Sequence, residues 1–308
     1  MTEAIKIKKL TKHFRKARMV DLLINIKKNC MCGFANRFLL MFIMICVAFL
    51  YSFAQSPAEE LMDDFGKYYE QYDVDGSAVV YDEKNNKYYF YNKAQYTEMF
   101  TPASTFKICN SLIGLETGVV KDENFVIKWD GVDRVRPEWN KDQDMKSAFR
   151  NSTVWYYQEM ARRVGGERMK HWLEKANYGN RDTLGGIDQF WLAGNLRISP
   201  EQQIAFLKLL HDGNLPFAIR TMEIVKKIMI KEGSKANYIV RAKTGWGGQE
   251  TKEKEFLNIG WYVGYIEADN NVYYFSNCIQ SSDDNNPDFV KARIEIMDKI
   301  LNELKIYE

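Results

Sequence analysis

The chain has 308 residues, of which 46% are hydrophobic and 14% aromatic, enough to bury the core of one large domain. Its formal net charge of +2 is unevenly distributed: residues 1–37 carry ten Lys or Arg against two acidic residues, and the remainder carries 33 basic and 39 acidic residues. A mildly acidic body lacks the basic face that nucleic-acid binding requires, so no nucleic-acid partner is expected.

An apolar run follows the basic segment over residues 37–56 and ends in small residues at Ser52 and Ala54. This pattern is typical of a secretory signal peptide, with cleavage predicted between Ala54 and Gln55. The run is slightly long for a signal core, so an uncleaved membrane anchor is the alternative.

We therefore divide the chain into a basic N-terminal region with its signal, residues 1–54, and one catalytic domain, residues 55–308. Met31 is an alternative start that would leave a conventional signal. The mature protein is expected to be secreted to the periplasm without membrane contact. The sequence carries no signal for an oligomeric state.

Hydrophobic periodicity predicts strands at both ends of the domain with helices between them. The predicted helices span residues 57–71, 104–117, 153–164, 167–176, 200–211, 218–231 and 287–305. The predicted strands form a hairpin over 77–92 and three segments at 238–246, 257–267 and 271–280. This order indicates an α+β fold: an antiparallel sheet flanked by helices, with a mainly helical subdomain inserted at roughly residues 100–232.

Cys109 and Cys278 are the cysteines beyond the signal. Export permits a disulfide between them, but cysteines in apolar elements more often act as small buried hydrophobes. The histidines are isolated in sequence, and no His, Cys and Asp pattern has metal-ligand spacing, so no metal site is predicted.

Ser104 and Lys107 are three residues apart in "PASTFKICN" (102–110), so both lie on one face of the helix predicted to start there. Chance alone gives such a spacing about once per chain of this length. Two features favour a nucleophile beside its base. Ser104 occurs at a helix start, where N–H groups stabilise anions, and Lys107 lies between apolar neighbours.

Three further motifs follow in a fixed order. "NSTVWYY" (151–157) contains Ser152-Thr-Val154, in which Ser152 alone could be a helix N-cap. "NYGNRD" (177–182) reads as a turn, and "RAKTGWGG" (241–248) places Lys243-Thr244-Gly245 in a strand where a ligand could closely approach the glycine.

In this order, the motifs resemble those of the serine β-lactamase and penicillin-binding superfamily. Ser-Thr-Phe-Lys, Ser-x-Val, Tyr-Gly-Asn and Trp191-Leu192 before "RIS" are similar to class D, the oxacillinases, over about residues 77–303. The resemblance implies hydrolysis of the lactam amide of penicillin-type antibiotics, with Ser104 as nucleophile and Lys107 as base. Ser152 would relay the proton, and Lys243 would support that relay electrostatically.

The resemblance also implies that Lys107 carries CO₂ as a carbamate, so that no cofactor is bound but CO₂ or bicarbonate is needed. Burial can lower a lysine pKa by about 3–5 units, which leaves the amine neutral and able to react. The apolar wall around it would be supplied by Phe106, Val154, Trp191 and Leu192. The Trp191 indole N–H would donate a hydrogen bond to the carbamate.

The small-molecule β-lactam is the expected partner. By resemblance, its carboxylate would be bound by Arg293, and the residues around it would be Ser152, Lys243, Thr244, Gly245 and Trp246. The N–H groups of Ser104 and Trp246 would form the oxyanion hole. An arginine on the solvent face of a helix is the alternative for Arg293. The loops 131–150 and 247–256 would set the substrate range.

Three other functions share these motifs. A β-lactam sensor is acylated but releases the drug very slowly, a cell-wall transpeptidase or carboxypeptidase uses the same nucleophile on a peptide, and an envelope binding protein has the fold without catalysis. Sensors follow several membrane spans, whereas this sequence has one apolar run, so hydrolysis is favoured.

Overall fold

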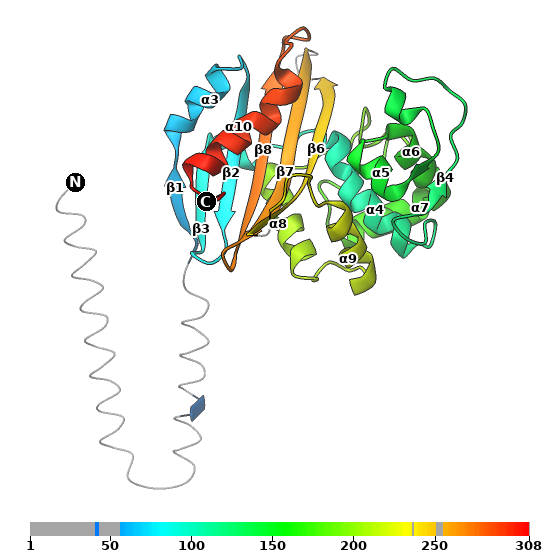
Figure 1. Cartoon of the computed structure of the whole chain (residues 1–308), viewed down its shortest axis with the longest axis horizontal. Coiled ribbons are helices and arrows are strands. Elements are labelled where there is room, and N and C mark those ends of the chain that lie inside the picture. The colour runs from blue at the N-terminus through cyan, green and yellow to red at the C-terminus, as the bar shows by residue number, and fades with distance from the viewer. Residues whose placement is uncertain (1–40, 43–55, 236, 251–254, 308) are drawn as a thin grey trace, which may run out of the picture. The chain divides into compact units, whose positions relative to one another are not determined.

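The computed structural model describes residues 41–42, 56–235, 237–250 and 255–307 (Figure 1). The predicted signal cleavage site, and most of the signal itself, lie outside the described residues. Within the described ranges, no helix combines the length and hydropathy needed to cross a bilayer. Pro57–Glu308 forms one compact unit.

A six-stranded sheet forms one part of this unit, with the strand order β1-β3-β2-β8-β7-β6. Its strands are β1 (Ala58–Leu61), β2 (Asp75–Asp82), β3 (Lys87–Tyr91), β6 (Tyr238–Glu250), β7 (Phe256–Ala268) and β8 (Asn271–Ser281). All neighbouring pairs except β1 and β3 are antiparallel. The predicted hairpin and the three C-terminal strands are thereby confirmed, and β6 lies at an edge of the sheet.

The predicted helix at 57–71 is wrong at its beginning. Ala58–Leu61 is a strand that pairs in parallel with β3, and only α3 (Gly66–Glu70) is α-helical, after a 3₁₀ turn at Asp63–Phe65. Alanine, glutamate and leucine favour a helix in isolation, but helix propensity is a weak preference. The free edge of β3 offers hydrogen bonds to a neighbouring strand, and pairing there overrides that preference.

Most of the helical insert lies beyond the β6 edge of the sheet in Figure 1, whereas α8 (Pro200–His211) packs against the sheet, mainly on β8. The insert contains the 3₁₀ turn η3 (Ala103–Phe106), α4 (Lys107–Glu116), α5 (Met145–Arg150), α6 (Val154–Val164), α7 (Gly166–Lys175), α8 and α9 (Ile219–Ile228). Its smaller elements are β4 (Val126–Ile127), η4 (Pro137–Trp139) and β5 (Gln143–Asp144), and η2 (Lys93–Thr97) precedes it. The sequence did not predict α5 or the β4–β5 pair. Helix α9 ends before residue 231 because Ile230 bridges to Arg241 of β6.

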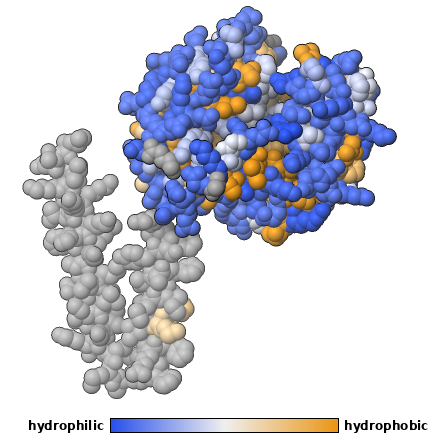
Figure 2. Space-filling model, in the orientation of Figure 1, coloured by the Kyte–Doolittle hydropathy of each residue, from blue (hydrophilic) through white to orange (hydrophobic). Residues whose placement is uncertain are grey.

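Two hydrophobic cores occupy the two faces of the sheet. The C-terminal helix α10 (Phe289–Glu303) covers one face. Ile296 of this helix and Phe275 of β8 are both buried in the core between them. The other core joins the sheet to the insert. Every residue from 107 to 115 of α4 is buried, and the apolar ones belong to this core. The predicted α+β fold with an inserted helical region is confirmed. Figure 2 shows a mostly hydrophilic face with hydrophobic residues in separate groups.

The two cysteines belong to these cores. Cys109 on α4 and Cys278 on β8 are both free and fully buried. They act as small hydrophobic side chains, so the alternative of a disulfide does not hold.

Candidate active site

Ser104 lies in η3, at the entry to the buried helix α4. Its neighbour Ala103 has a φ of +47°, a conformation that costs a non-glycine residue about 1–3 kcal/mol and is found at functional sites. The turn is held by Thr105, whose N–H and Oγ1 both donate to the Pro102 carbonyl, at 3.1 and 2.7 Å. Gln203 of α8 donates to Thr105 Oγ1 at 2.9 Å. Ser104 itself is half-buried, so its hydroxyl is held in a rigid frame at the surface of the core.

Lys107 lies one turn further on and is fully buried, with an exposed fraction of 0%. Its Nζ is 2.8 Å from Ser104 Oγ and 5.3 Å from the ring centre of Tyr157. No carboxylate of the described residues forms an ion pair with it. Burial without a counter-charge disfavours the ammonium form and lowers the pKa of Lys107 to about 7. A neutral amine within hydrogen-bond reach of a hydroxyl can act as a general base.

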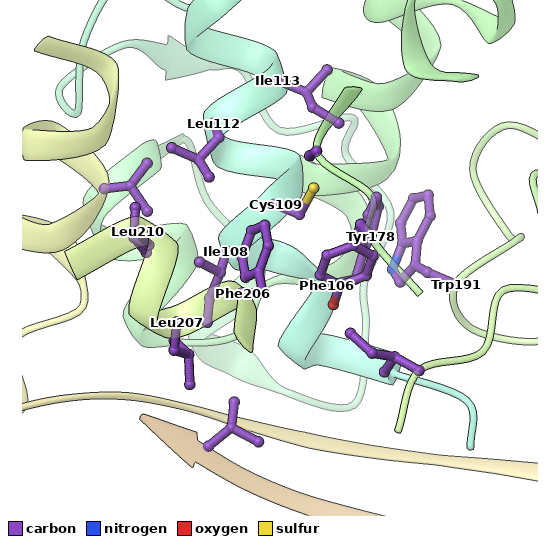
Figure 3. Close-up of a cluster of buried hydrophobic side chains, with 14 of the residues drawn as sticks. Phe106, Ile108, Cys109, Leu112, Ile113, Tyr178, Trp191, Phe206, Leu207 and Leu210 are labelled. Atoms are coloured by element: carbon purple, nitrogen blue, oxygen red, sulfur yellow. The ribbon is translucent and has the colours of Figure 1, made fainter. Parts of the chain in front are cut away.

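Three of the aromatic side chains near the start of α4 pack together, and Figure 3 shows them: Phe106, Tyr178 and Trp191. The ring centres of Phe106 and Trp191 are 5.3 Å apart, and both side chains are fully buried. Trp191 Nε1 is a buried donor with no hydrogen-bond partner among the described residues. A buried donor that stays unpaired costs about 1–3 kcal/mol, so an acceptor placed beside Trp191 Nε1 would be stabilised by its hydrogen bond. The other two predicted wall residues, Val154 and Leu192, are half-buried.

Ser152 precedes α6 without capping it. The helix begins at Val154, and its N-cap is Thr153, which makes no side-chain capping bond. Ser152 has a φ of +55°, which marks a second strained position. The N-cap interpretation of Ser152 therefore does not hold, and its half-buried hydroxyl has no capping role.

Lys243 comes from β6, at the edge of the sheet nearest the insert. It is 5% exposed, its Nζ donates to the Thr244 carbonyl at 3.0 Å, and it lies 5.6 Å from the ring centre of Phe149. Burial, followed by the positive charges of Lys107 and Arg293, holds the pKa of Lys243 well below its usual value. The structure therefore brings Lys107 close enough to Lys243 for its charge to lower the pKa of Lys243.

Gly245 allows β6 to approach η3. A Cβ at this position would lie 2.9 Å from the Pro102 carbonyl oxygen and 3.1 Å from Thr105 Cγ2. The glycine was expected to admit a ligand, but the closest neighbour is the turn that carries Ser104. The next residue, Trp246, is 48% exposed, and its Nε1 reaches Asn258 Oδ1 at 3.4 Å.

Arg293 of α10 reaches the same strand. Its Nη1 donates to the Gly245 carbonyl, its Nε donates to the Val290 carbonyl at 2.9 Å, and it is 9% exposed. Burial, together with the charge of Arg136, lowers the pKa of Arg293 to about 10. Arg293 is therefore not an arginine on the solvent face of a helix, because its guanidinium lies beside the Lys243-Thr244-Gly245 segment.

Arg136 and Tyr157 belong to the site but were not predicted from the sequence. Arg136 is the N-cap of η4. Its guanidinium lies 5.5 Å from the ring centre of Trp139, whose Nε1 donates to the Asn151 carbonyl at 3.0 Å. Its charge lowers the pKa of both Lys243 and Arg293. The sequence feature that could have indicated Arg136 is Trp139, three residues further on, whose ring it covers. The site thus gathers positive charge that favours an anionic substrate.

One group of potential metal ligands occurs elsewhere. Glu83, His211 and Asp212 place their ligand atoms within 4.8 Å of one another, a grouping that the sequence did not predict. His211 Nδ1 is 2.9 Å from Asp212, and Lys208 pairs with Glu83 at 3.1 Å. These contacts form an ion-pair network at the end of α8. His211 is eight residues from Gln203, which contacts the turn of Ser104, so the network lies about 12 Å along the helix from that turn.

Comparison with known proteins identifies relatives over most of the chain. Residues 76–302 match the family profile described as the penicillin binding protein transpeptidase domain. Beta-lactamase OXA-20 from Pseudomonas aeruginosa is 39% identical over 242 residues, which cover 78% of this chain and 87% of the relative.

Two solved structures are similar in fold as well as in sequence. The class D beta-lactamase YbXI from Nostoc is 45% identical with a TM-score of 0.72, covering 78% of this chain and 98% of its own. The C-terminal domain of the Bacillus licheniformis BlaR penicillin-receptor is 31% identical with a TM-score of 0.74, covering 82% of this chain and 99% of its own.

Proposed function

This chain belongs to the class D serine β-lactamases, within the family of penicillin-binding transpeptidase domains, and we propose that it hydrolyses β-lactams through a Ser104 acyl-enzyme and so confers antibiotic resistance. The observation that carries the proposal is the contact of 2.8 Å between Ser104 Oγ and Lys107 Nζ, a buried amine whose pKa is about 7. A serine hydroxyl is a weak nucleophile until an adjacent base accepts its proton.

In the acylation step, the base on Lys107 accepts the proton of Ser104 while Oγ bonds to the lactam carbonyl carbon. The N–H groups of Ser104 and Trp246 stabilise the developing oxyanion, and each such donor contributes about 3–4 kcal/mol. The ring C–N bond then breaks. Ser152 gives its proton to the departing nitrogen and takes up the proton that the base on Lys107 had accepted, which restores the base. Lys243, which lies nearby, supports that transfer electrostatically. Water next attacks the ester carbonyl carbon and gives a proton to the base. The base passes this proton to Ser104 Oγ as the ester C–O bond breaks, so Ser104 and the base are both restored.

We further propose that Lys107 works as a carbamate formed with CO₂. Two observations support this. The amine is buried without a counter-charge, and Trp191 Nε1 is a buried donor that has no hydrogen-bond acceptor among the described residues. The carbamate would supply an anionic base in place of a neutral one. Phe106 and Trp191, with Val154 and Leu192 beside them, would exclude water from it and so slow its loss.

The substrate carboxylate would be bound at the Lys243-Thr244-Gly245 end of β6. Arg293 bonds the Gly245 carbonyl and still has donors to offer, and Arg136 adds a second guanidinium charge nearby. Penicillin-type compounds carry such a carboxylate next to the lactam ring. This arrangement supports them as the substrate class.

The similarity to a penicillin-receptor domain makes a sensor the second candidate, because a sensor shares the acylation step but hardly deacylates. Intact mass after brief exposure to penicillin, together with nitrocefin turnover, distinguishes the candidates. Hydrolysis with recovery of free protein supports a β-lactamase. A lasting adduct without turnover indicates a sensor, an adduct with peptide cleavage a peptidase, and an unchanged mass a binding protein.

Activity is expected to fall as the pH falls through 7. The active form of Lys107 is unprotonated, whether the amine acts itself or first takes up CO₂. With a pKa of about 7, the neutral fraction rises from about a tenth at pH 6 to about nine tenths at pH 8. kcat/KM for nitrocefin should therefore rise about tenfold between these values, and a flat profile in a protein that stays folded would contradict the assignment.

Arg293→Ala is expected to raise KM by about tenfold and to lower kcat less, because a carboxylate contact that is equal in substrate and transition state is lost as uniform binding. Steady-state kinetics with several penicillins would measure this. Arg163→Ala, which removes a surface arginine paired with Glu159 at 2.8 Å, is the control. An unchanged KM across the penicillins would remove Arg293 from the substrate site.

We also propose that the protein is exported to the periplasm and begins at Gln55 once the signal is removed. The basic segment and the apolar run before Ala54 support this. Edman sequencing or intact mass of the secreted protein would test it. A mature chain that retains residues 38–54 would show that the segment is an anchor.

A further inference from the structure

A pocket of about 630 Å³ lies beside the catalytic strand and begins at Lys243 and Thr244. It extends between α5, the end of α9 with the turn that follows, and α10. This volume is within the usual range of small-molecule sites. Its apolar walls include Phe149, Ile228 and Met229.

The pocket is positively charged. Five basic side chains and two carboxylates line it, a formal net charge of +3 when every lysine is protonated. The two carboxylates are already paired: Glu123 with Lys227 at 2.7 Å and Glu232 with Arg150 at 3.0 Å. The positive charge that remains belongs to Lys146, Lys231 and the catalytic Lys243.

Two of these three lysines have no catalytic role. Lys231 Nζ donates to the Tyr262 hydroxyl at 2.9 Å and lies 4.7 Å from its ring centre, so a neutral partner holds this ammonium at the pocket wall. Burial lowers the pKa of Lys231, and the negative charge of Asp298 partly opposes this without forming an ion pair with it. Lys146 is exposed at the rim and forms no ion pair with a carboxylate of the described residues. Both can therefore pair with an incoming anion.

We propose that this pocket is a second substrate subsite, which binds an acidic substituent carried by the same ring as the substrate carboxylate. The inference rests on the proposed function, in which that carboxylate lies at Thr244 and Arg293. A substituent on the neighbouring ring atom would extend past Thr244 into the pocket. Cephalosporins have such a substituent and penicillins do not, so the subsite favours cephalosporins whose 3-substituent ends in a carboxylate or sulfonate.

The test compares cephalosporins with one common acyl side chain and either a methyl or a sulfonate-terminated 3-substituent. The double variant Lys146→Gln/Lys231→Gln should raise KM for the sulfonate compound about fivefold, as expected for the loss of two partly exposed ion pairs. KM for the methyl compound and for a penicillin should change less than about twofold. Lys170→Gln, which removes an exposed lysine paired with Glu174 on α7, is the matched control.

An equal rise in KM for all substrates would overturn the subsite, because the lysines would then act through the general field of the cleft. An unchanged KM for the sulfonate compound in a folded double variant would overturn it as well. If the native protein turned over no β-lactam, the proposed function would fail separately. The subsite would then be tested by acylation rates from intact mass, with the same preference for the sulfonate compound expected.

Discussion

Ser104→Ala is expected to lower nitrocefin hydrolysis by about 10³-fold or more while the protein stays folded. The variant keeps the buried lysine but has no hydroxyl to form the acyl-enzyme. The mass of the protein should therefore remain unchanged after exposure to penicillin.

The fold should tolerate this change. The N-cap of η3 is Pro102 and the turn has no side-chain cap, so the cap energy expected for a serine at a helix start is not lost. The Lys107 amine does lose its 2.8 Å partner, at a cost of about 1 kcal/mol, which lowers the melting temperature of a domain this size by about 2–4 °C. Ser77→Ala, in the buried part of β2, is the control and should hydrolyse normally. Near-native hydrolysis by Ser104→Ala would show that another group is the nucleophile.

Lys107→Ala is expected to acylate slowly and to deacylate hardly at all, so that a penicilloyl adduct accumulates. The reason is that both steps need a base beside Ser104 Oγ, and no other titratable side chain is hydrogen-bonded to that atom among the described residues. Intact mass over minutes to hours would show the adduct. Rapid recovery of unmodified protein would mean that a different group activates water.

The native protein should lose much of its activity in degassed, mildly acidic buffer and regain it with bicarbonate, because carbamate formation is reversible and needs the neutral amine. Trp191→Phe keeps the aromatic wall but removes the buried Nε1 donor, so it should need more bicarbonate for half-maximal activity. Val154→Thr should sharpen the dependence by admitting water. Indifference to bicarbonate in both native and Val154→Thr protein would mean that Lys107 acts unmodified.

Much of the fold was predictable because its elements have strong local patterns. The strands β6, β7 and β8 are rich in aromatic and β-branched residues, and α6, α7 and α9 have clear apolar periodicity. The errors occur where local preference is weak. The four residues of β1 form a strand only because β3 lies beside them, and α5 is a helix of six residues within a long irregular segment.

By itself the sequence determined that Ser104 and Lys107 meet, because residues three apart share a helix face whatever surrounds the helix. The order of the motifs likewise determined the family. Only the tertiary structure decided the chemistry of Lys107, since its pKa depends on its burial, to which Tyr157 contributes from fifty positions away. It also decided that Arg293 reaches Gly245 and that Arg136 adds its charge nearby. Long-range packing sets these contacts, and no spacing within one helix or strand encodes them.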